Sequence, residues 1–201
     1  MEGTTSLGLL QQLEMADKNA TLAINSLNSP VTDFIWQVFS DKEIWFPLYI
    51  GFLIYLYVKL GWKKATVITV ACILTIVACD QFSNFTKEFF ARFRPCYDDY
   101  MLQNGLHMLE GKGNHYGFYS AHAANAMGFA LSSLTGLKAD SARSHRIWPP
   151  VICVWAFLVG ISRIFVGKHF LGDVIVGLLV GALFGWLLAQ IGRWVIRRFS
   201  L

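Results

Sequence analysis

Residues 170–191 read FLGDVIVGLLVGALFGWLLAQI, with a single charged residue, Asp173, near the start. A helix needs about 17–25 predominantly apolar residues to cross the hydrocarbon core of a bilayer, and this stretch meets that length. Gly177, Gly181 and Gly185 recur at intervals of four, which places them on one helix face, where small residues allow two helix backbones to approach closely. The stretch therefore predicts a transmembrane helix that packs on a neighbour through its glycines.

The rest of the chain contains more stretches of this kind. Of its 201 residues, 55% are hydrophobic and only 15% charged, and the mean hydropathy is +0.46. Soluble domains carry about 25% charged residues, so a soluble globular protein is excluded. A net charge of +4 is too small to indicate nucleic-acid binding. We predict an all-α polytopic membrane helix bundle, a single domain over 1–201 with a transmembrane core at 44–201, whose five spans are 44–62, 65–85, 118–137, 147–165 and 170–191.

Residues 1–43 predict an amphipathic segment ahead of the core. Its apolar residues recur at helical spacing: Leu9, Leu13, Ala16, Ala20, Ile24 and Leu27. Ser29 is suited to an N-cap and Pro30 to the first turn of a second short helix. Both helices are too polar to span, so we expect them to lie in the membrane interface plane. Packing on the edge of the bundle is an equally good interpretation of the pattern.

Basic residues concentrate on one side of the predicted spans. The turns after the first and third spans and the C-terminal tail hold one acid, Asp140, beside nine basic residues: Lys59, Lys63, Lys64, Lys138, Arg143, Arg146, Arg193, Arg197 and Arg198. The opposite side holds the other eight basic and twelve acidic residues. Cytoplasmic loops are enriched in Lys and Arg, so we predict a cytoplasmic C terminus and an external N-terminal segment. A bacterial inner membrane is the expected location.

Ionisable residues near membrane depth are costly and indicate function, and several fall on the predicted external side. Lys87 and Arg94 are seven residues apart, two helical turns, so both are expected on one helix face before Pro95 ends the helix. Two converging cations suit a phosphate, since the Arg fork can bind two of its oxygens. Taken singly, Lys87 or Arg163 is equally well explained as a base that reaches the headgroups.

The start of the third span adds a second anion-binding element. Ser120 and Ala121 are expected where free backbone N–H groups and the helix dipole attract an anion. His169 and Asp173 form an i, i+4 pair, expected on one helix face, in which the carboxylate holds one ring nitrogen protonated and leaves the other as a nucleophile or base. His122 is then free to donate a proton. Alone, Ser120 is explained as an N-cap and His122 as a structural histidine.

Residues 95–117 form the longest polar connection, beside these side chains. A loop of this length is either a lid or binding element, or a plain external loop, and the sequence leaves both open. Cys96 is the cysteine that falls in this polar loop, so it is expected to react with a membrane-impermeant thiol reagent added outside. Asp80 precedes the loop near the end of the second span, where it either supports the site or joins two helices by a hydrogen bond.

Three motifs in this region resemble those of the type-2 phosphatidic acid phosphatase family. KEFFARFRP at 87–95 matches Lys-x6-Arg-Pro, and SRIFVGKHFLGD at 162–173 matches Ser-Arg-x5-His-x3-Asp. The second motif, Pro-Ser-Gly-His, is represented by YSAH at 119–122, in which Tyr119 and Ala121 replace the usual proline and glycine. Three motifs in order on one membrane face are far more specific than any one alone. The small bacterial five-span members resemble this chain along its whole length.

The resemblance implies a role for each matching residue. His169 is the expected nucleophile, Asp173 orients it, and His122 protonates the leaving oxygen and then helps water attack a phosphohistidine. The groups expected to hold the phosphate oxygens are Lys87, Arg94, Ser120, the Ala121 amide and Arg163. No metal or cofactor is implied, because fixed cations and a helix N-terminus neutralise the phosphoryl group. A metal triad of His122, His169 and Asp173 is the alternative, disfavoured by the neighbouring cations.

The resemblance implies a hydrolase that removes a phosphate from a lipid at the periplasmic leaflet. Undecaprenyl diphosphate, phosphatidylglycerol phosphate, phosphatidate and a lipid A phosphate all remain candidates, and the oligomeric state stays open. Vanadium-dependent haloperoxidases carry the same motifs but resemble soluble proteins, so the five spans argue against that activity. The other alternative is an anion-binding transporter that uses the basic cluster as its site. Transporters usually show paired repeats with broken helices, which this sequence lacks.

Overall fold

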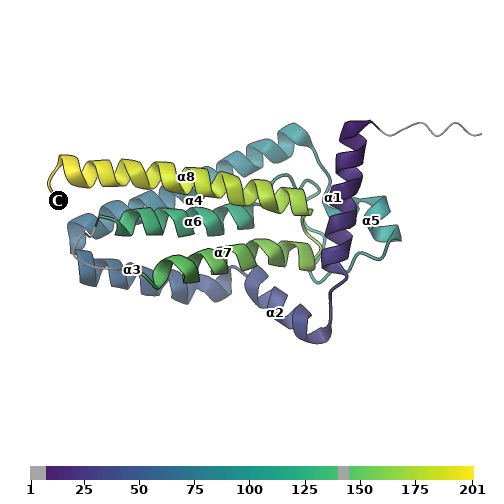
Figure 1. Ribbon diagram of the computed structural model, residues 1–201, viewed down its shortest axis with the longest axis horizontal. Coiled ribbons are helices and arrows are strands. Elements are labelled where there is room, and N and C mark those ends of the chain that lie inside the picture. Colours follow the sequence, from purple (N-terminus) through teal and green to yellow (C-terminus); the bar gives the residue numbers. More distant parts are fainter. Residues whose placement is uncertain (1–7, 140–144) are drawn as a thin grey trace, which may run out of the picture.

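The computed structural model describes residues 8–139 and 145–201, and within these ranges the chain is helical and free of strands (Figure 1). Helices α3, α4, α6, α7 and α8 run side by side, and α1 lies across one end of them. The predicted all-α membrane bundle is confirmed at this level. The long elements are α1 (Leu9–Asn25), α2 (Pro30–Ser40), α3 (Phe46–Leu60), α4 (Trp62–Phe90), α6 (Ala121–Leu137), α7 (Trp148–Phe165) and α8 (Leu171–Arg198), and the short ones η1 (Glu43–Trp45), η2 (Pro95–Tyr97) and α5 (Asp99–Gln103).

Four segments within the described ranges are long and apolar enough to cross a membrane: Glu43–Leu60, Trp62–Phe90, Trp148–Phe165 and Leu171–Arg198. The third predicted span is shorter than expected. Its helix, α6, begins at Ala121 and has 17 residues, because Ser120 adopts an extended backbone and serves as N-cap. At 1.5 Å per residue α6 is about 25 Å long, close to the thickness of a hydrocarbon core.

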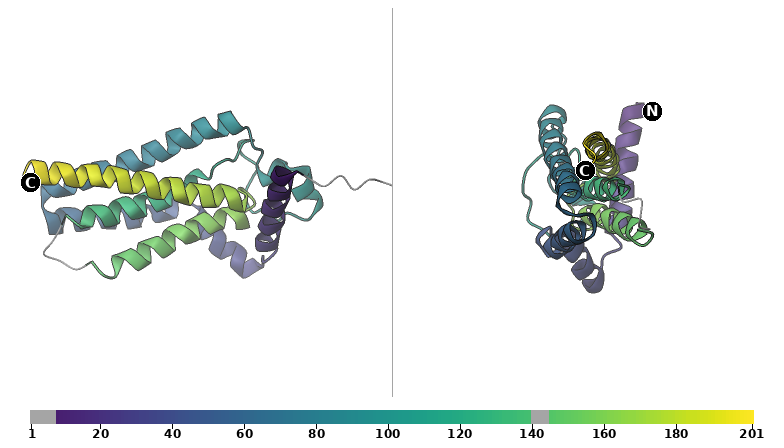
Figure 2. Two further views of the ribbon diagram at one scale, coloured as in Figure 1. Left: turned by 45° about the horizontal axis from the view of Figure 1, so that its top comes forward. Right: turned by 90° about the vertical axis from the view of Figure 1, so that its left-hand side faces the viewer.

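The glycines of α8 pack against α6, as the sequence predicts. A Cβ atom on Gly177, Gly181 or Gly185 would collide with a backbone carbonyl oxygen of α6 or of its N-cap. The three oxygens belong to Ser120, Ala124 and Gly128, one helical turn apart. The two backbones therefore touch at three points over about two turns, and α6 lies in the interior of the bundle, beside α4, α7 and α8 (Figure 2).

The N-terminal helices pack on the end and side of the bundle, with α1 against α7 and α8 and α2 against α7. Ser29 caps α2 by accepting a bond from Thr32 N, and Pro30 is its first residue, as predicted. In α1 the polar face meets the protein, since Asn25 is buried and donates to two carbonyl oxygens at the end of α7. Leu9 and Leu13, from the predicted apolar face, are exposed. Helix α1 therefore packs on the bundle, but partly through polar residues, and much of its apolar stripe stays exposed.

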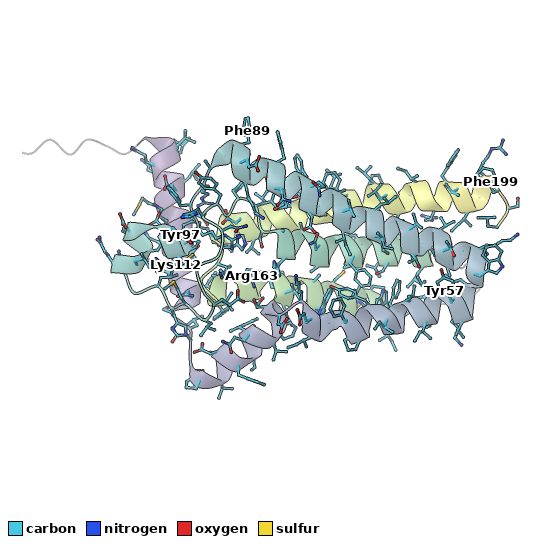
Figure 3. The ribbon with its side chains drawn as sticks, turned by 180° about the vertical axis from the view of Figure 1, so that it is seen from behind. Tyr57, Phe89, Tyr97, Lys112, Arg163 and Phe199 are labelled. Carbon is cyan, nitrogen blue, oxygen red and sulfur yellow. The ribbon has the colours of Figure 1, made fainter. Side chains whose placement is uncertain are left out.

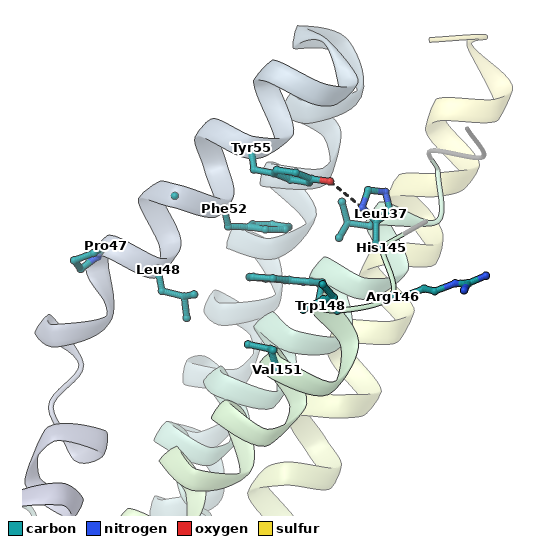
Figure 4. A pocket seen from close by; sticks show the side chains of 11 residues that line it. Pro47, Leu48, Phe52, Tyr55, Leu137, His145, Arg146, Trp148 and Val151 are labelled. Atoms are coloured by element: carbon teal, nitrogen blue, oxygen red, sulfur yellow. Dashed lines mark hydrogen bonds between the residues drawn. The ribbon is translucent and has the colours of Figure 1, made fainter. Parts of the chain in front are cut away.

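The opposite end of the bundle carries the C terminus and a cavity of about 890 Å³ between α3 and the start of α7 (Figure 4). Phe52 and Trp148 stack in its wall with ring centroids 5.0 Å apart, and Tyr55 Oη lies 2.9 Å from His145 Nδ1. In the part of the chain that the structure describes, no residue of α1 and no motif residue lines this cavity. Asp140 and Arg143, which were counted in predicting a cytoplasmic C terminus, lie outside the described residues.

Candidate active site

His169 and Asp173 meet at the start of α8. The helix begins at Leu171, so His169 precedes it, and the expectation that both residues occupy one helix face is wrong. Asp173 instead folds back over the helix N-terminus, where its Oδ2 accepts a hydrogen bond from Phe170 N at 3.1 Å and lies 3.5 Å from His169 Nδ1. That separation is within ion-pair range, and Nδ1 has no hydrogen bond to any described residue. Both side chains are buried.

Arg92 is a residue of the site that the sequence analysis missed. Its Nη1 donates to Asp173 Oδ1 at 2.7 Å, its Nη2 donates to Asp17 Oδ2 of α1 at 2.6 Å, and its guanidinium lies 4.2 Å from the Phe170 ring centroid. Burial lowers the pKa of Arg92, but the two carboxylates outweigh that effect and raise it overall. A buried carboxylate needs such a partner, so Arg92 fixes the charge and the position of Asp173.

Arg94 reaches the site by a different route from the one predicted. Helix α4 ends at Phe90 because Ala91 adopts a left-handed conformation, φ 46°, and reverses the chain. Arg94 therefore lies beyond the helix, in an extended segment. Its backbone N donates to His115 O at 2.9 Å. Its Nε donates to Tyr116 O at 3.1 Å. The prediction that Lys87 and Arg94 share one helix face is therefore wrong. The two cations still lie close enough to repel each other.

Three cations converge on His169. Burial lowers its pKa well below the ordinary value of 6.5, and the charges of Arg94, Arg163 and Lys87 lower it further. The imidazole is therefore neutral near pH 7, which is the form that can act as a nucleophile. The first motif supplies two of these cations and the third motif supplies Arg163, so the structure brings the two motifs together around one ring.

Arg163 is buried at the end of α7 and is held by a carboxylate from the 95–117 loop. Its Nη1 and Nη2 donate to Glu110 Oε1 and Oε2 at 3.1 and 3.3 Å, and Nη1 also bonds Ser40 Oγ of α2. Its Nε is buried without a partner among the described residues, which leaves one directed donor for an anion. Figure 3 shows Arg163 at the same end of the bundle as Tyr97 and Lys112 of the loop.

The second motif forms the N-terminus of α6. Ser120 is its N-cap, with Oγ accepting from Ala123 N at 3.5 Å, and Ser120 N donates to Asp173 O at 3.0 Å. Ala121 and His122 occupy the first turn, where backbone N–H groups are free for an anion. His122 is within electrostatic range of Arg163 and His169. All eight residues predicted for the site thus gather at one end of the bundle.

The 95–117 loop is packed over this end. Lys168, beside His169, donates to Lys112 O at 3.1 Å and to Gly111 O, and His107 Nε2 lies 2.9 Å from Asp33 Oδ2 of α2. Cys96 is only 1% exposed, so its predicted reactivity toward an external reagent is wrong. It is buried because η2 turns its side chain inward, toward Lys112 O. The loop is therefore a tethered cover and not a plain external connection.

The alternative metal triad has no support from the geometry. Among the described residues, no group of three or more His, Cys, Asp and Glu side chains is placed to hold a metal ion. The side chains around His169 are mostly cationic, which suits an anion instead.

We expect the acid limb of kcat/KM to lie below the ordinary histidine pKa. Because the pKa of His169 is lowered, the ring stays neutral as the pH falls through 6.5, and activity is lost only at lower pH. The measurement is kcat/KM for p-nitrophenyl phosphate between about pH 4.5 and 8, corrected for titration of the substrate phosphate, whose second pKa is about 6. A half-maximal point at or above 6.5 would contradict the proposed environment of His169.

Comparison with known proteins agrees with the three motifs. The model of the PAP2 superfamily matches residues 65–197. The lipid A 4'-phosphatase of Bacteroides thetaiotaomicron is 31% identical over 96% of this chain and 84% of its own length, and that of Porphyromonas gingivalis is 32% identical over 89% and 76%. In fold, the chain resembles the transmembrane PAP2-type phosphatidylglycerolphosphate phosphatase of Bacillus subtilis, with a TM-score of 0.71, 20% identity, and coverage of 90% of this chain and 86% of that one.

These similarities extend over both the motif region and the full bundle, and they favour the phosphatase over the haloperoxidase and transporter alternatives. The chain belongs to the PAP2 superfamily and is a membrane phosphatase.

Proposed function

We propose that the protein hydrolyses a phosphate monoester of a lipid at the external leaflet, and that it removes the 4'-phosphate of lipid A or of a similar glycolipid. The observation that carries the chemistry is a buried histidine, His169, surrounded by three cations and within electrostatic range of a second histidine, His122. The two relatives at 31% and 32% identity, both lipid A 4'-phosphatases, support this choice of substrate.

The proposed reaction proceeds in two steps. A ring nitrogen of His169 attacks phosphorus, and the bond to the ester oxygen breaks as His122 donates its proton to that oxygen. Water then attacks the phosphohistidine, His122 takes a proton from the water, and phosphate leaves with His169 regenerated. Asp173 stabilises the positive charge that develops on His169, and Arg92 keeps Asp173 ionised and in place.

Fixed donors hold the phosphate during both steps. The buried Arg163 Nε has no partner among the described residues, so it is available to a phosphate oxygen, while Glu110 and Ser40 occupy the other two nitrogens and fix the guanidinium plane. Lys87, Arg94, Ser120 Oγ and the free N–H groups of Ala121 and its neighbours complete the set. Such preorganised donors stabilise the charge of the transition state.

The proposed membrane arrangement has five spans, with α6 as the fifth because it lies among the four apolar helices and is almost long enough to cross. The site then faces the periplasm of a bacterial inner membrane, as the charge asymmetry indicates. The exposed apolar side chains of α1 and α2 are suited to the lipid interface: Leu9, Leu10, Leu13, Val31 and Phe34.

Phosphate release from purified protein tests this function directly. Lipid A, phosphatidylglycerol phosphate, phosphatidate and undecaprenyl diphosphate are supplied in the same detergent micelles, with His169→Gln as the inactive control. We expect release from lipid A to be fastest and to be unchanged by EDTA. No release from any of the four lipids would contradict the function, and faster release from another lipid would reassign the substrate.

Topology is tested with introduced cysteines, because the native Cys96 is buried. Gln103 of α5 is exposed near the site, and Lys63 is exposed at the opposite end. A membrane-impermeant maleimide should label Gln103→Cys in intact spheroplasts and label Lys63→Cys only after permeabilisation. The parent protein gives the background from its own cysteines. The reverse pattern would place the site in the cytoplasm.

A further inference from the structure

A second cavity, of about 390 Å³, opens beside the candidate proton donor. Ala121 and His122 line it from α6, and Ser40 lines it from the end of α2. Ser40 also bonds Arg163, so the cavity adjoins the proposed phosphate site. A group that leaves with a proton from His122 must occupy space next to that side chain, and this cavity provides it.

Asp80 of α4 and Asn125 of α6 line the cavity wall and carry hydrogen-bond acceptors. Asn125 is three residues after His122, on the same face of α6, and its Nδ2 donates to Asp80 Oδ1 of α4 at 2.8 Å. That bond fixes the amide, and Asn125 Oδ1 remains buried without a partner among the described residues. An unpaired buried carbonyl costs free energy, so a ligand that donates to it gains affinity. Asp80, as a carboxylate, also only accepts.

The remaining wall is largely aromatic. Trp45, Tyr49 and Trp155 line the cavity, and the rings of Trp45 and Trp155 meet edge to face with centroids 5.6 Å apart. A sugar ring combines apolar C–H faces with hydroxyl and amide edges, so it matches aromatic walls that carry a few acceptors. A prenyl chain has no donor for Asn125. A lipid diphosphate that loses its terminal phosphate leaves as a lipid monophosphate, an anion that the carboxylate of Asp80 repels.

We propose that this cavity is the leaving-group subsite, and that Asp80 and Asn125 select a sugar by accepting hydrogen bonds from its hydroxyl or amide groups. The proposal rests on the proposed function and adds the residues that choose among lipid phosphates. Lys42 and Trp155 also line the cavity, and the Lys42 ammonium and the buried Trp155 Nε1, which has no partner among the described residues, are donors that would favour an anionic leaving group instead. The experiments below separate these two outcomes.

The first experiment uses the unmodified protein and two soluble phosphates of similar ring size. Glucosamine 4-phosphate offers hydroxyl and amino donors, whereas cyclohexyl phosphate offers none. Each is measured as a competitive inhibitor of p-nitrophenyl phosphate hydrolysis, with inorganic phosphate as the reference. We expect the sugar phosphate to bind about tenfold more tightly than the cyclohexyl ester, the size of one or two hydrogen bonds to buried acceptors. Inorganic diphosphate is measured in the same way. Equal inhibition by the sugar phosphate and the cyclohexyl ester, or tighter binding of inorganic diphosphate than of the sugar phosphate, would overturn the proposal.

The second experiment measures selectivity in variants. Asn125→Leu keeps the side-chain shape and removes the acceptor, and Asp80→Asn removes the charge. We expect each to lower the ratio of kcat/KM for lipid A to that for phosphatidate by about tenfold. Gln81→Leu is the matched control, because Gln81 follows Asp80 on α4 but is exposed outside the cavity, and its ratio should not change.

The outcomes also separate this proposal from the proposed function. A parent protein that releases phosphate from no lipid contradicts the function itself. A parent that hydrolyses lipid A, with variants whose ratio is unchanged or whose rates fall equally on both lipids, overturns the subsite alone. If a variant does not accumulate, the inhibitor comparison on the unmodified protein still decides the question.

Discussion

His169→Gln is expected to abolish turnover of every phosphate ester, lowering kcat by more than about 10⁴-fold, because the covalent route loses its nucleophile. Glutamine has a similar size and keeps a polar group in the buried site, so the fold should persist. The measurement is phosphate release with both lipid A and p-nitrophenyl phosphate. His115→Gln is the control, since the His115 side chain is exposed, its ring stacks on Tyr97, and its bond to Arg94 N is made by the backbone oxygen, which the substitution keeps.

Rapid quenching with radiolabelled substrate tests the same residue by another readout. The parent protein should yield an acid-labile, alkali-stable phosphoprotein, as expected for a phosphorus–nitrogen bond, and His169→Gln should yield none. Label that persists in the variant, or that survives acid, would place the nucleophile on another residue. Substantial turnover by the variant would exclude the covalent mechanism.

Arg163→Lys is expected to lower kcat/KM by about 10²–10³-fold, the usual cost of removing one preorganised donor from a transition state. Lysine keeps the charge but lacks Nε, and it cannot bind both oxygens of Glu110 while also donating to a phosphate. Arg193→Lys is the matched control, because Arg193 lies near the C-terminal end of α8 and bonds only Gln190 among the described residues. A loss of less than about threefold would show that Nε does not contact the phosphate.

Hydropathy and motif spacing predicted the parts of the molecule that depend on neighbouring residues in the chain. The glycine face of α8 and the cap at Ser29 follow from local rules, and the structure bears out both. The convergence of the motifs was also predictable, because each motif falls at an end of a predicted span on the same side of the membrane.

The errors arose at two helix ends, where α4 stops earlier and α8 starts later than the sequence predicts. Lys87 and Arg94 were expected on one helix, but Ala91 is left-handed and nothing in its side chain signals that. His169 was expected within a helix that in fact starts two residues later. In both places the residues still meet, because the loop that replaces the helix returns them to the same end of the bundle.

The supporting contacts could not be predicted because their partners are distant in sequence. Arg92 lies within the first motif at a position that its pattern leaves open, and its two partners, Asp17 and Asp173, are 75 and 81 residues away. Glu110 is one acid among several in a polar loop, and only the folded chain places it on Arg163, 53 residues away.

The backbone contact between α6 and α8 has a consequence for how substrate enters. Where Cβ atoms are excluded, two helices cannot slide or rotate past each other without a clash, so Ser120 and Asp173 keep a constant separation through the reaction cycle. The movable elements are those held mainly by side chains, namely α1 through Asp17 and Asn25, and the 95–117 loop through Glu110 together with the backbone bond from Leu109 N to Val166 O. A lipid therefore enters, and phosphate leaves, when α1 and the 95–117 loop move relative to the rigid pair of α6 and α8. Mutations that slow product release should fall on the residues that hold α1 and the loop, and not on the transmembrane helices.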